Sequence, residues 1–171
     1  MSWAIWLTGP PAAGKTTIAR AFLDVAASEG VRCVHLESDA LRRILTPEPT
    51  YSSAERDRFY REVAELAALL VSQGVPVVVD ATAPLRAHRD WLRSRVKAFL
   101  EVFVEASLPI REARDPKGLY RLARSGGAPH LPGATEPYEE PLHPELVVSG
   151  EGSPEQAVTA LLRLARERKF L

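Results

Sequence analysis

The sequence contains a single cysteine, Cys33, which excludes an internal disulfide. It also lacks an apolar run long enough to span a membrane, and its first residues lack the basic flank of a signal peptide. Twenty-two basic side chains balance twenty-two acidic ones, so no net charge attracts nucleic acid or an anionic membrane. We therefore expect a cytoplasmic protein without a nucleic-acid or membrane partner, in which a local cluster of groups binds any anion.

What is present is the composition of an ordinary folded domain, with 46% hydrophobic and 26% charged residues in 171 positions. This length predicts a single domain over residues 1–171. Short runs rich in Val and Ile alternate with longer segments of helical periodicity, a pattern typical of an α/β fold around a parallel sheet. We predict strands at 3–8, 31–36, 75–80, 99–105 and 146–148, and helices at 16–28, 40–45, 52–73, 85–97 and from 154 onward.

Residues 115–144 interrupt this alternation. The stretch is rich in glycine and proline and carries charges of both signs. Loops of this length in a compact domain are commonly functional lids or disordered segments. Of these two we favour a lid that closes over a binding site.

A glycine-rich motif lies between the first predicted strand and the first predicted helix. It runs Gly9, Pro10, Pro11, Ala12, Ala13, Gly14, Lys15 and Thr16, followed by Thr17. This pattern, G-x-x-x-x-G-K-[ST], is the phosphate-binding P-loop, in which backbone amides and a helix N-terminus surround phosphate oxygens. We predict that all nine residues bind ATP.

Three side chains of this loop have separate predicted roles. Lys15 would neutralise the β- and γ-phosphates and act in catalysis. Thr16 would ligate Mg²⁺ through its hydroxyl, and Thr17 would contact the α-phosphate. The predicted cofactor is therefore Mg²⁺, with ATP as co-substrate.

Two carboxylates, Asp39 and Asp80, follow apolar strands, and such strand ends line the ligand crevice of open α/β sheets. Asp39 could orient or deprotonate an acceptor hydroxyl, and Asp80 could hold Mg²⁺ through water. The alternative for either residue is simply to cap the next helix. Arg42 would lie one helical turn beyond Asp39 and could contact an anion.

Two further segments carry a family resemblance. The run from Arg114 to Tyr120 reads Arg-Asp-Pro-Lys-Gly-Leu-Tyr, and Tyr-Glu-Glu-Pro follows at 138–141. Together with the P-loop, these segments resemble adenylylsulfate kinases over most of the chain. The resemblance implies a three-layer α/β/α P-loop NTPase fold with a five-stranded parallel sheet and a lid. It implies a MgATP-dependent kinase that phosphorylates the 3′-hydroxyl of adenosine 5′-phosphosulfate (APS) in sulfate assimilation, commonly as a homodimer.

The resemblance also implies which residues bind the acceptor nucleotide. They are Asp39, Arg42, Tyr51, Arg56, Lys117 and Leu119. Asp39 takes a catalytic role, Tyr51 stands where the family has a stacking phenylalanine, and Lys117 and Leu119 belong to the lid. Ala83 replaces the serine that is phosphorylated in many members, so we expect direct in-line transfer.

Other departures from the family keep alternatives open. Glu37-Ser38-Asp39 stands in place of Asp-Gly-Asp, and Phe59 occupies the position of an asparagine. A related kinase with a different hydroxyl acceptor is therefore one alternative. A nucleotide-binding switch is a second, from a different class of protein, although no guanine-reading Asn-Lys-x-Asp motif is present.

Overall fold

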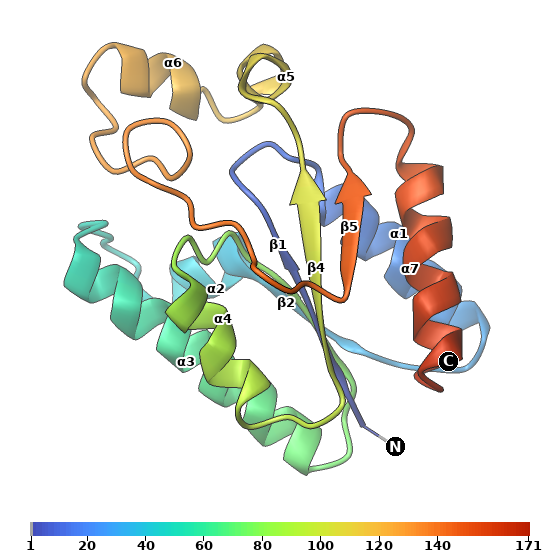
Figure 1. Ribbon diagram of the computed structural model, residues 1–171. Helices are drawn as coiled ribbons and strands as arrows, with labels where there is room; N and C mark the ends of the chain where they lie inside the picture. Colours follow the sequence, from blue (N-terminus) through green and yellow to red (C-terminus); the bar gives the residue numbers. More distant parts are fainter. Residues whose placement is uncertain (1) are drawn as a thin grey trace.

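The computed structural model describes residues 2–171, and its centre is a five-stranded parallel sheet. The strands are β1 (Ala4–Thr8), β2 (Val34–Glu37), β3 (Val77–Asp80), β4 (Phe99–Glu105) and β5 (Leu146–Ser149). Their order across the sheet is β2-β3-β1-β4-β5 (Figure 1). The predicted five-stranded parallel sheet is confirmed.

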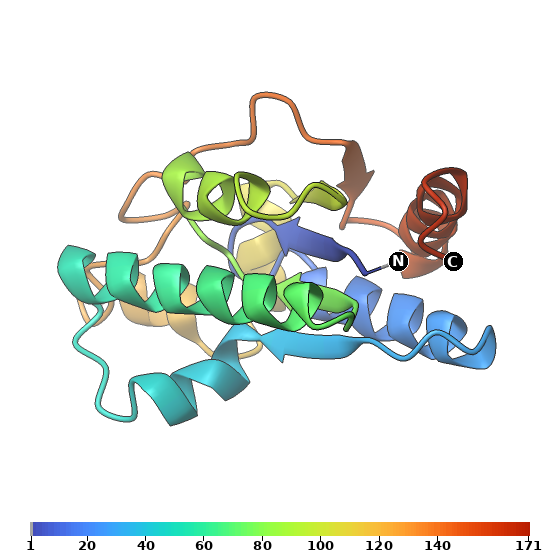
Figure 2. The same cartoon turned by 90° about the horizontal axis from the view of Figure 1, so that it is seen from below.

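Helices cover both faces of the sheet. They are α1 (Lys15–Ser28), α2 (Ser38–Leu45), α3 (Ser53–Ser72), α4 (Arg86–Arg93), α5 (Leu108–Arg114), α6 (Leu119–Arg124) and α7 (Pro154–Glu167). α1 and α7 pack on one face, and α3 and α4 pack on the other (Figures 1 and 2). The molecule is therefore the three-layer α/β/α sandwich that the sequence predicted.

The alternation of side chains along the strands explains these layers. Ile5, Leu7 and Val78 point into the core under α1 and α7, whereas Trp6 and Val79 point into the core under α3 and α4. Because both faces are buried, the strands need apolar residues at nearly every position, which produces their Val- and Ile-rich runs. The carboxyl ends of all five strands meet at one edge of the sheet.

Several predicted boundaries move by a few residues. β3 begins at Val77 rather than 75, because Pro76 lacks the amide hydrogen needed to join the ladder. α4 ends at Arg93 rather than 97, where the chain turns and the Arg95 amide donates to the Leu92 carbonyl (3.0 Å), three residues back rather than four. α2 begins at Ser38 rather than 40, which places Asp39 in its first turn.

Residues 115–144 begin above the carboxyl ends of the strands, and the last part of this stretch then crosses beside the sheet to the amino end of β5 (Figure 1). The sequence pattern predicts no helix in this stretch, but it contains the short helix α6, and α5 directly precedes it. Over residues 2–171, no helix has the length and apolar character needed to cross a membrane.

Candidate active site

A cavity of about 500 Å³ opens at the carboxyl edge of the sheet, within the usual size range of small-molecule sites. Three parts of the chain form its wall: the P-loop with the start of α1, the ends of β2, β3 and β5, and residues 114–120. From the predicted site, the lining includes Pro11, Ala12, Gly14, Lys15, Thr16, Thr17, Asp39, Asp80, Lys117 and Leu119. Segments far apart in the sequence thus meet in one hollow.

The P-loop backbone determines the shape of this wall. Gly9 has a φ of 154°, and a Cβ there would lie 2.4 Å from the Val104 carbonyl oxygen, so only glycine fits. α1 begins at Lys15 with Gly14 as its N-cap, and no side chain caps it. The amides of its first turn have no intrahelical partners and face the cavity end of the helix. Unpaired amides and the helix dipole favour a phosphate there.

Lys15 is the buried cation of the loop. Its Nζ donates hydrogen bonds to the carbonyl oxygens of Gly9 (2.9 Å) and Pro10 (3.0 Å), which hold the ammonium against the loop. Burial lowers the pKa of Lys15 to about 8, and the nearby Asp80 only partly opposes this shift. An anionic ligand would therefore stabilise the charged form of this side chain.

Asp80 ends β3 beside Lys15 and Thr16. The residue is only 2% exposed, and its Oδ2 has no hydrogen-bond partner among residues 2–171. Burial by itself would raise the pKa of Asp80, but interactions with His35, Lys15 and Thr16 together lower it. A buried, ionised carboxylate with one free oxygen next to a P-loop hydroxyl suits a hard divalent cation such as Mg²⁺. The residues present therefore fit the cofactor.

Asp39 and Lys117 face each other across the cavity. Asp39 lies in the first turn of α2, and its carboxylate accepts a hydrogen bond from the Lys117 ammonium, in the loop before α6. Leu119 lies on the cavity wall close by. The structure thus brings together three of the six residues that the family resemblance assigned to the acceptor.

The other three predicted acceptor residues lie outside the cavity wall. The Arg42 guanidinium stacks over the Phe59 ring at 4.0 Å and lies 5.2 Å from the exposed Tyr51 ring. Its Nη1 lies 3.7 Å from Glu55, beyond hydrogen-bond distance, and is buried without a partner among the described residues. Arg42 and Tyr51 therefore form a cationic and aromatic group beside the cavity.

Arg56, the last of these residues, is buried under the crossing segment. Its Nη1 donates to Glu136 (2.5 Å), and its Nη2 donates to the carbonyl oxygen of His130 (2.6 Å). In this conformation Arg56 therefore binds the 130–136 loop, and an acceptor could reach its guanidinium only after that loop moved.

Sequence reasoning missed several residues of the cavity. A Cβ on Gly150, after β5, would lie 1.8 Å from the Ala13 carbonyl oxygen, so the P-loop needs glycine at this distant position. Arg114 lies on the wall and donates to the carbonyl oxygens of Ala12 (3.4 Å) and Glu151 (3.2 Å). Tyr120 donates to the Pro11 carbonyl oxygen (2.8 Å). Arg114 and Tyr120 belong to the family-like run, so that signal could have identified them, whereas no local pattern distinguished Gly150.

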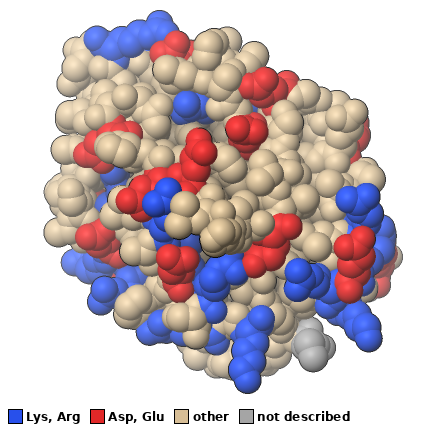
Figure 3. Space-filling model, in the orientation of Figure 1, with Lys and Arg blue, Asp and Glu red and all other residues tan. Residues whose placement is uncertain are grey.

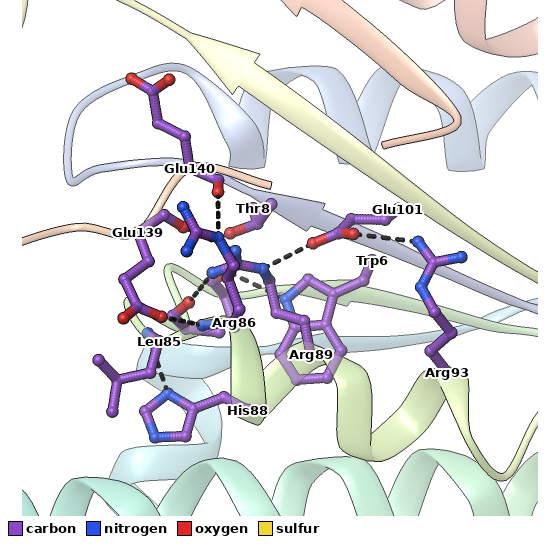
Figure 4. A network of polar contacts seen from close by, with 12 residues as sticks. Trp6, Thr8, Leu85, Arg86, His88, Arg89, Arg93, Glu101, Glu139 and Glu140 are labelled. Atoms are coloured by element: carbon purple, nitrogen blue, oxygen red, sulfur yellow. Dashed lines mark hydrogen bonds and ion pairs between the residues drawn. The ribbon is translucent and has the colours of Figure 1, made fainter. Parts of the chain in front are cut away.

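A buried network of ion pairs and hydrogen bonds connects the elements next to the site (Figure 4). Arg89, only 1% exposed, donates to Glu101 (2.6 Å) and to the carbonyl oxygens of Ala83 and Glu139. Glu101 also accepts from Arg93 (3.0 Å). The network connects α4 and β4 to the segment that leaves the crossing loop, and it holds the turn after Asp80.

The molecular surface agrees with the neutral composition. Acidic and basic side chains are mixed over the face seen in Figure 3. That face therefore lacks the continuous basic stripe of a nucleic-acid interface.

Comparisons with known proteins agree with this geometry. The family model described as adenylylsulphate kinase matches residues 1–149. A probable adenylyl-sulfate kinase of Archaeoglobus fulgidus is 42% identical over 148 residues, covering 86% of this chain and 96% of the relative. The adenylyl-sulfate kinase of Burkholderia ambifaria is 38% identical over 164 residues, covering 94% of this chain and 91% of the relative.

A solved structure gives the same result. The APS kinase of Mycobacterium tuberculosis, in complex with AMPPNP and APS, superposes with a TM-score of 0.90 at 31% identity. The match covers 96% of this chain and 98% of that one. The resemblance inferred from the sequence is confirmed, and the chain belongs to the adenylylsulphate kinase family of P-loop kinases.

Proposed function

We propose that this protein transfers the γ-phosphoryl group of MgATP to the 3′-hydroxyl of APS, giving 3′-phosphoadenosine 5′-phosphosulfate and ADP. One observation carries the proposal: a single cavity contains the P-loop, with Lys15 and Thr16, and the carboxylate of Asp39. A donor site and a candidate base therefore share the space in which phosphoryl transfer would occur.

On the donor side, the chain supplies charge and position. The free amides at the start of α1 and the Lys15 ammonium would bind the β- and γ-phosphates, and Arg114 adds a second cation on the wall. Thr16 and Asp80 would hold Mg²⁺, Asp80 through water. Bound there, the cation would neutralise charge on the phosphates. Phosphate bound beside Lys15 would favour the charged side chain and so raise its pKa above the lowered value of the free protein.

On the acceptor side, Asp39 is the base. Its carboxylate accepts the proton of the 3′-hydroxyl, the oxygen attacks the γ-phosphorus in line, and the bond to the ADP oxygen breaks. Lys117, which pairs with Asp39 in the present conformation, is released to contact the transferred group or the acceptor. Ala83 carries no hydroxyl, so no phosphoserine can form at that position and the transfer is direct.

The rest of the acceptor binds next to the cavity. Tyr51 offers an aromatic face for the adenine, and Arg42 offers a buried Nη1 that lies 3.7 Å from Glu55 and has no hydrogen-bond partner among residues 2–171. Arg56 becomes available when the 130–136 loop moves away from it. Residues 115–144 therefore act as a lid, whose contacts with Asp39 and Arg56 must change when the acceptor enters.

The test is a product assay. The protein is incubated with MgATP and APS, and the products are separated by chromatography beside a reaction without acceptor. We expect a nucleotide phosphorylated at the 3′-position in amounts equal to the ADP formed. Rapid transfer to a sugar or nucleoside hydroxyl, with none to APS, would show that the acceptor is a different hydroxyl compound. ADP formation at the same rate with and without any acceptor would favour a nucleotide-hydrolysing switch.

A further inference from the structure

His35, which sequence reasoning left without a function, lies against Asp80. In the parallel pairing of β2 and β3, Glu37 is opposite Asp80, and His35 is two residues before Glu37. Residues two apart on a strand share a face, so His35 and Asp80 lie on the same side of the sheet. His35 Nε2 lies 3.7 Å from Asp80 Oδ2, an electrostatic contact slightly longer than a hydrogen bond.

Neither atom has a hydrogen-bond partner among the described residues. His35 Nε2 and Asp80 Oδ2 are both buried and unpaired among the described residues. An unpaired buried polar atom destabilises a fold, and such atoms usually have a partner or a function. A buried donor facing a buried acceptor indicates that these side chains act as a pair.

Packing alone does not account for the imidazole. His35 does not line the cavity, so it has no direct contact with a ligand there. Its neighbour Leu36 faces the opposite core, where an apolar side chain is sufficient. An apolar residue at 35 would also fill space without leaving a buried nitrogen. The contact of His35 Nε2 with Asp80 therefore accounts for a histidine at this position.

We propose that His35 is a positioning residue, which orients the Asp80 carboxylate for the divalent cation of the bound nucleotide. This inference rests on the proposed function of Asp80. The charge of Lys15 and the Thr16 side chain act on the same carboxylate from the P-loop side, whereas His35 lies against it from β2. In its Nε2–H tautomer, His35 directs this N–H at Asp80 Oδ2 and so restrains the orientation of the carboxylate. Groups that bind a metal are commonly oriented by such outer partners.

Manganese binding tests this inference independently of activity. Mn²⁺, used as a probe for Mg²⁺, is titrated into the protein with ADP bound and is followed by electron paramagnetic resonance. Replacement of partners behind metal ligands typically weakens metal binding about 10- to 100-fold, so we expect His35→Leu to lose at least about tenfold. His35→Gln keeps an N–H at a similar reach and should stay within about threefold of the wild type. ADP affinity measured in EDTA should be unchanged in both variants.

Asp80→Asn tests the role of Asp80 separately from that of His35. It should weaken Mn²⁺ binding, and His35→Leu should add nothing in that background, because the pair acts as a unit. Weak binding in Asp80→Asn together with wild-type binding in His35→Leu would overturn the role of His35 and leave that of Asp80. Unchanged binding in Asp80→Asn would overturn both roles.

A folding defect would not prevent the test. If His35→Leu does not fold, His35→Asn replaces it, because its shorter amide keeps polarity but does not reach as far as Nε2. Loss of Mn²⁺ affinity in His35→Asn with recovery in His35→Gln supports positioning. Equal affinity in both variants and the wild type contradicts it.

Discussion

Lys117 and Asp39 lie 78 residues apart in the sequence and form an ion pair across the cavity. Both side chains remain about half exposed, at 55% and 48%. Exposed ion pairs typically contribute only about 0–1 kcal/mol to stability. The pair can therefore open when a substrate enters without a large loss of folding free energy.

The first prediction concerns this lysine. Lys117→Gln should raise the KM for APS about tenfold and leave the KM for ATP nearly unchanged, because the ammonium released from Asp39 contacts the acceptor in the proposed complex. Steady-state kinetics with each substrate varied in turn measures both constants. Lys97→Gln, which removes an exposed charge far from the cavity, is the matched control. An equal rise in both KM values would show that Lys117 serves the donor instead.

A glycine pair provides the second prediction. A Cβ on Gly150 would lie 1.8 Å from the Ala13 carbonyl oxygen, whereas a Cβ on Gly152 would meet no atom within 4 Å. Gly150→Ala should therefore displace the P-loop, weaken ADP binding at least tenfold and lower the Tm. Gly152→Ala should change the free energy of unfolding by less than about 0.5 kcal/mol. Calorimetric titration and thermal unfolding compare the two variants, and similar behaviour would contradict the close approach.

Lys15 gives a prediction about pH. Its pKa in the free protein is lowered to about 8 by burial, and bound phosphate must raise it. Nucleotide binding at pH 8 should therefore take up about half a proton, and affinity should fall as the pH rises through this value. Calorimetric titrations with ADP in buffers of different ionisation enthalpy measure the uptake. Lys15→Arg stays charged and should show none, while absence of uptake in the wild type would refute the shift.

The buried network predicts a large effect on stability. Arg89→Leu removes the buried one of the two arginine partners of Glu101 and leaves the Ala83 and Glu139 carbonyl oxygens without their donor. Breaking a buried ion pair in this way costs about 3–5 kcal/mol. In contrast, Arg163→Leu removes an exposed pair with Glu167 and should change the free energy of unfolding by less than about 0.5 kcal/mol. Urea denaturation measures both variants, and equal changes would contradict the structural role of Arg89.

The sequence predicted the parts of this molecule that depend on local chemistry. The run from Gly9 to Thr17 predicted the loop and the Val-rich runs predicted the parallel sheet, whereas its three layers were implied by the family resemblance. A capping box at the start of α3 would pair the Ser52 hydroxyl with the Glu55 amide and the Glu55 carboxylate with the Ser52 amide. The first of these bonds is present (3.3 Å). The Glu55 carboxylate, however, accepts from the amides of Thr50 and Tyr51 rather than of Ser52.

Contacts between distant segments were not predictable in the same way. The pairing of Arg56 with Glu136, the approach of Gly150 to Ala13 and the contact of His35 with Asp80 depend on how the elements pack. No local pattern distinguishes these residues from others of their type. The division of the chain into one domain with a lid, and the homodimer, stay predictions.

The measurement that tests this account most directly compares Asp39→Asn with the wild type in the APS and MgATP assay, with ADP binding measured in parallel. We predict that kcat for 3′-phosphorylated product falls about 10²- to 10⁴-fold, as expected for loss of a general base, while ADP affinity stays within about twofold. A kcat close to that of the wild type would contradict the central claim that Asp39 activates the acceptor hydroxyl.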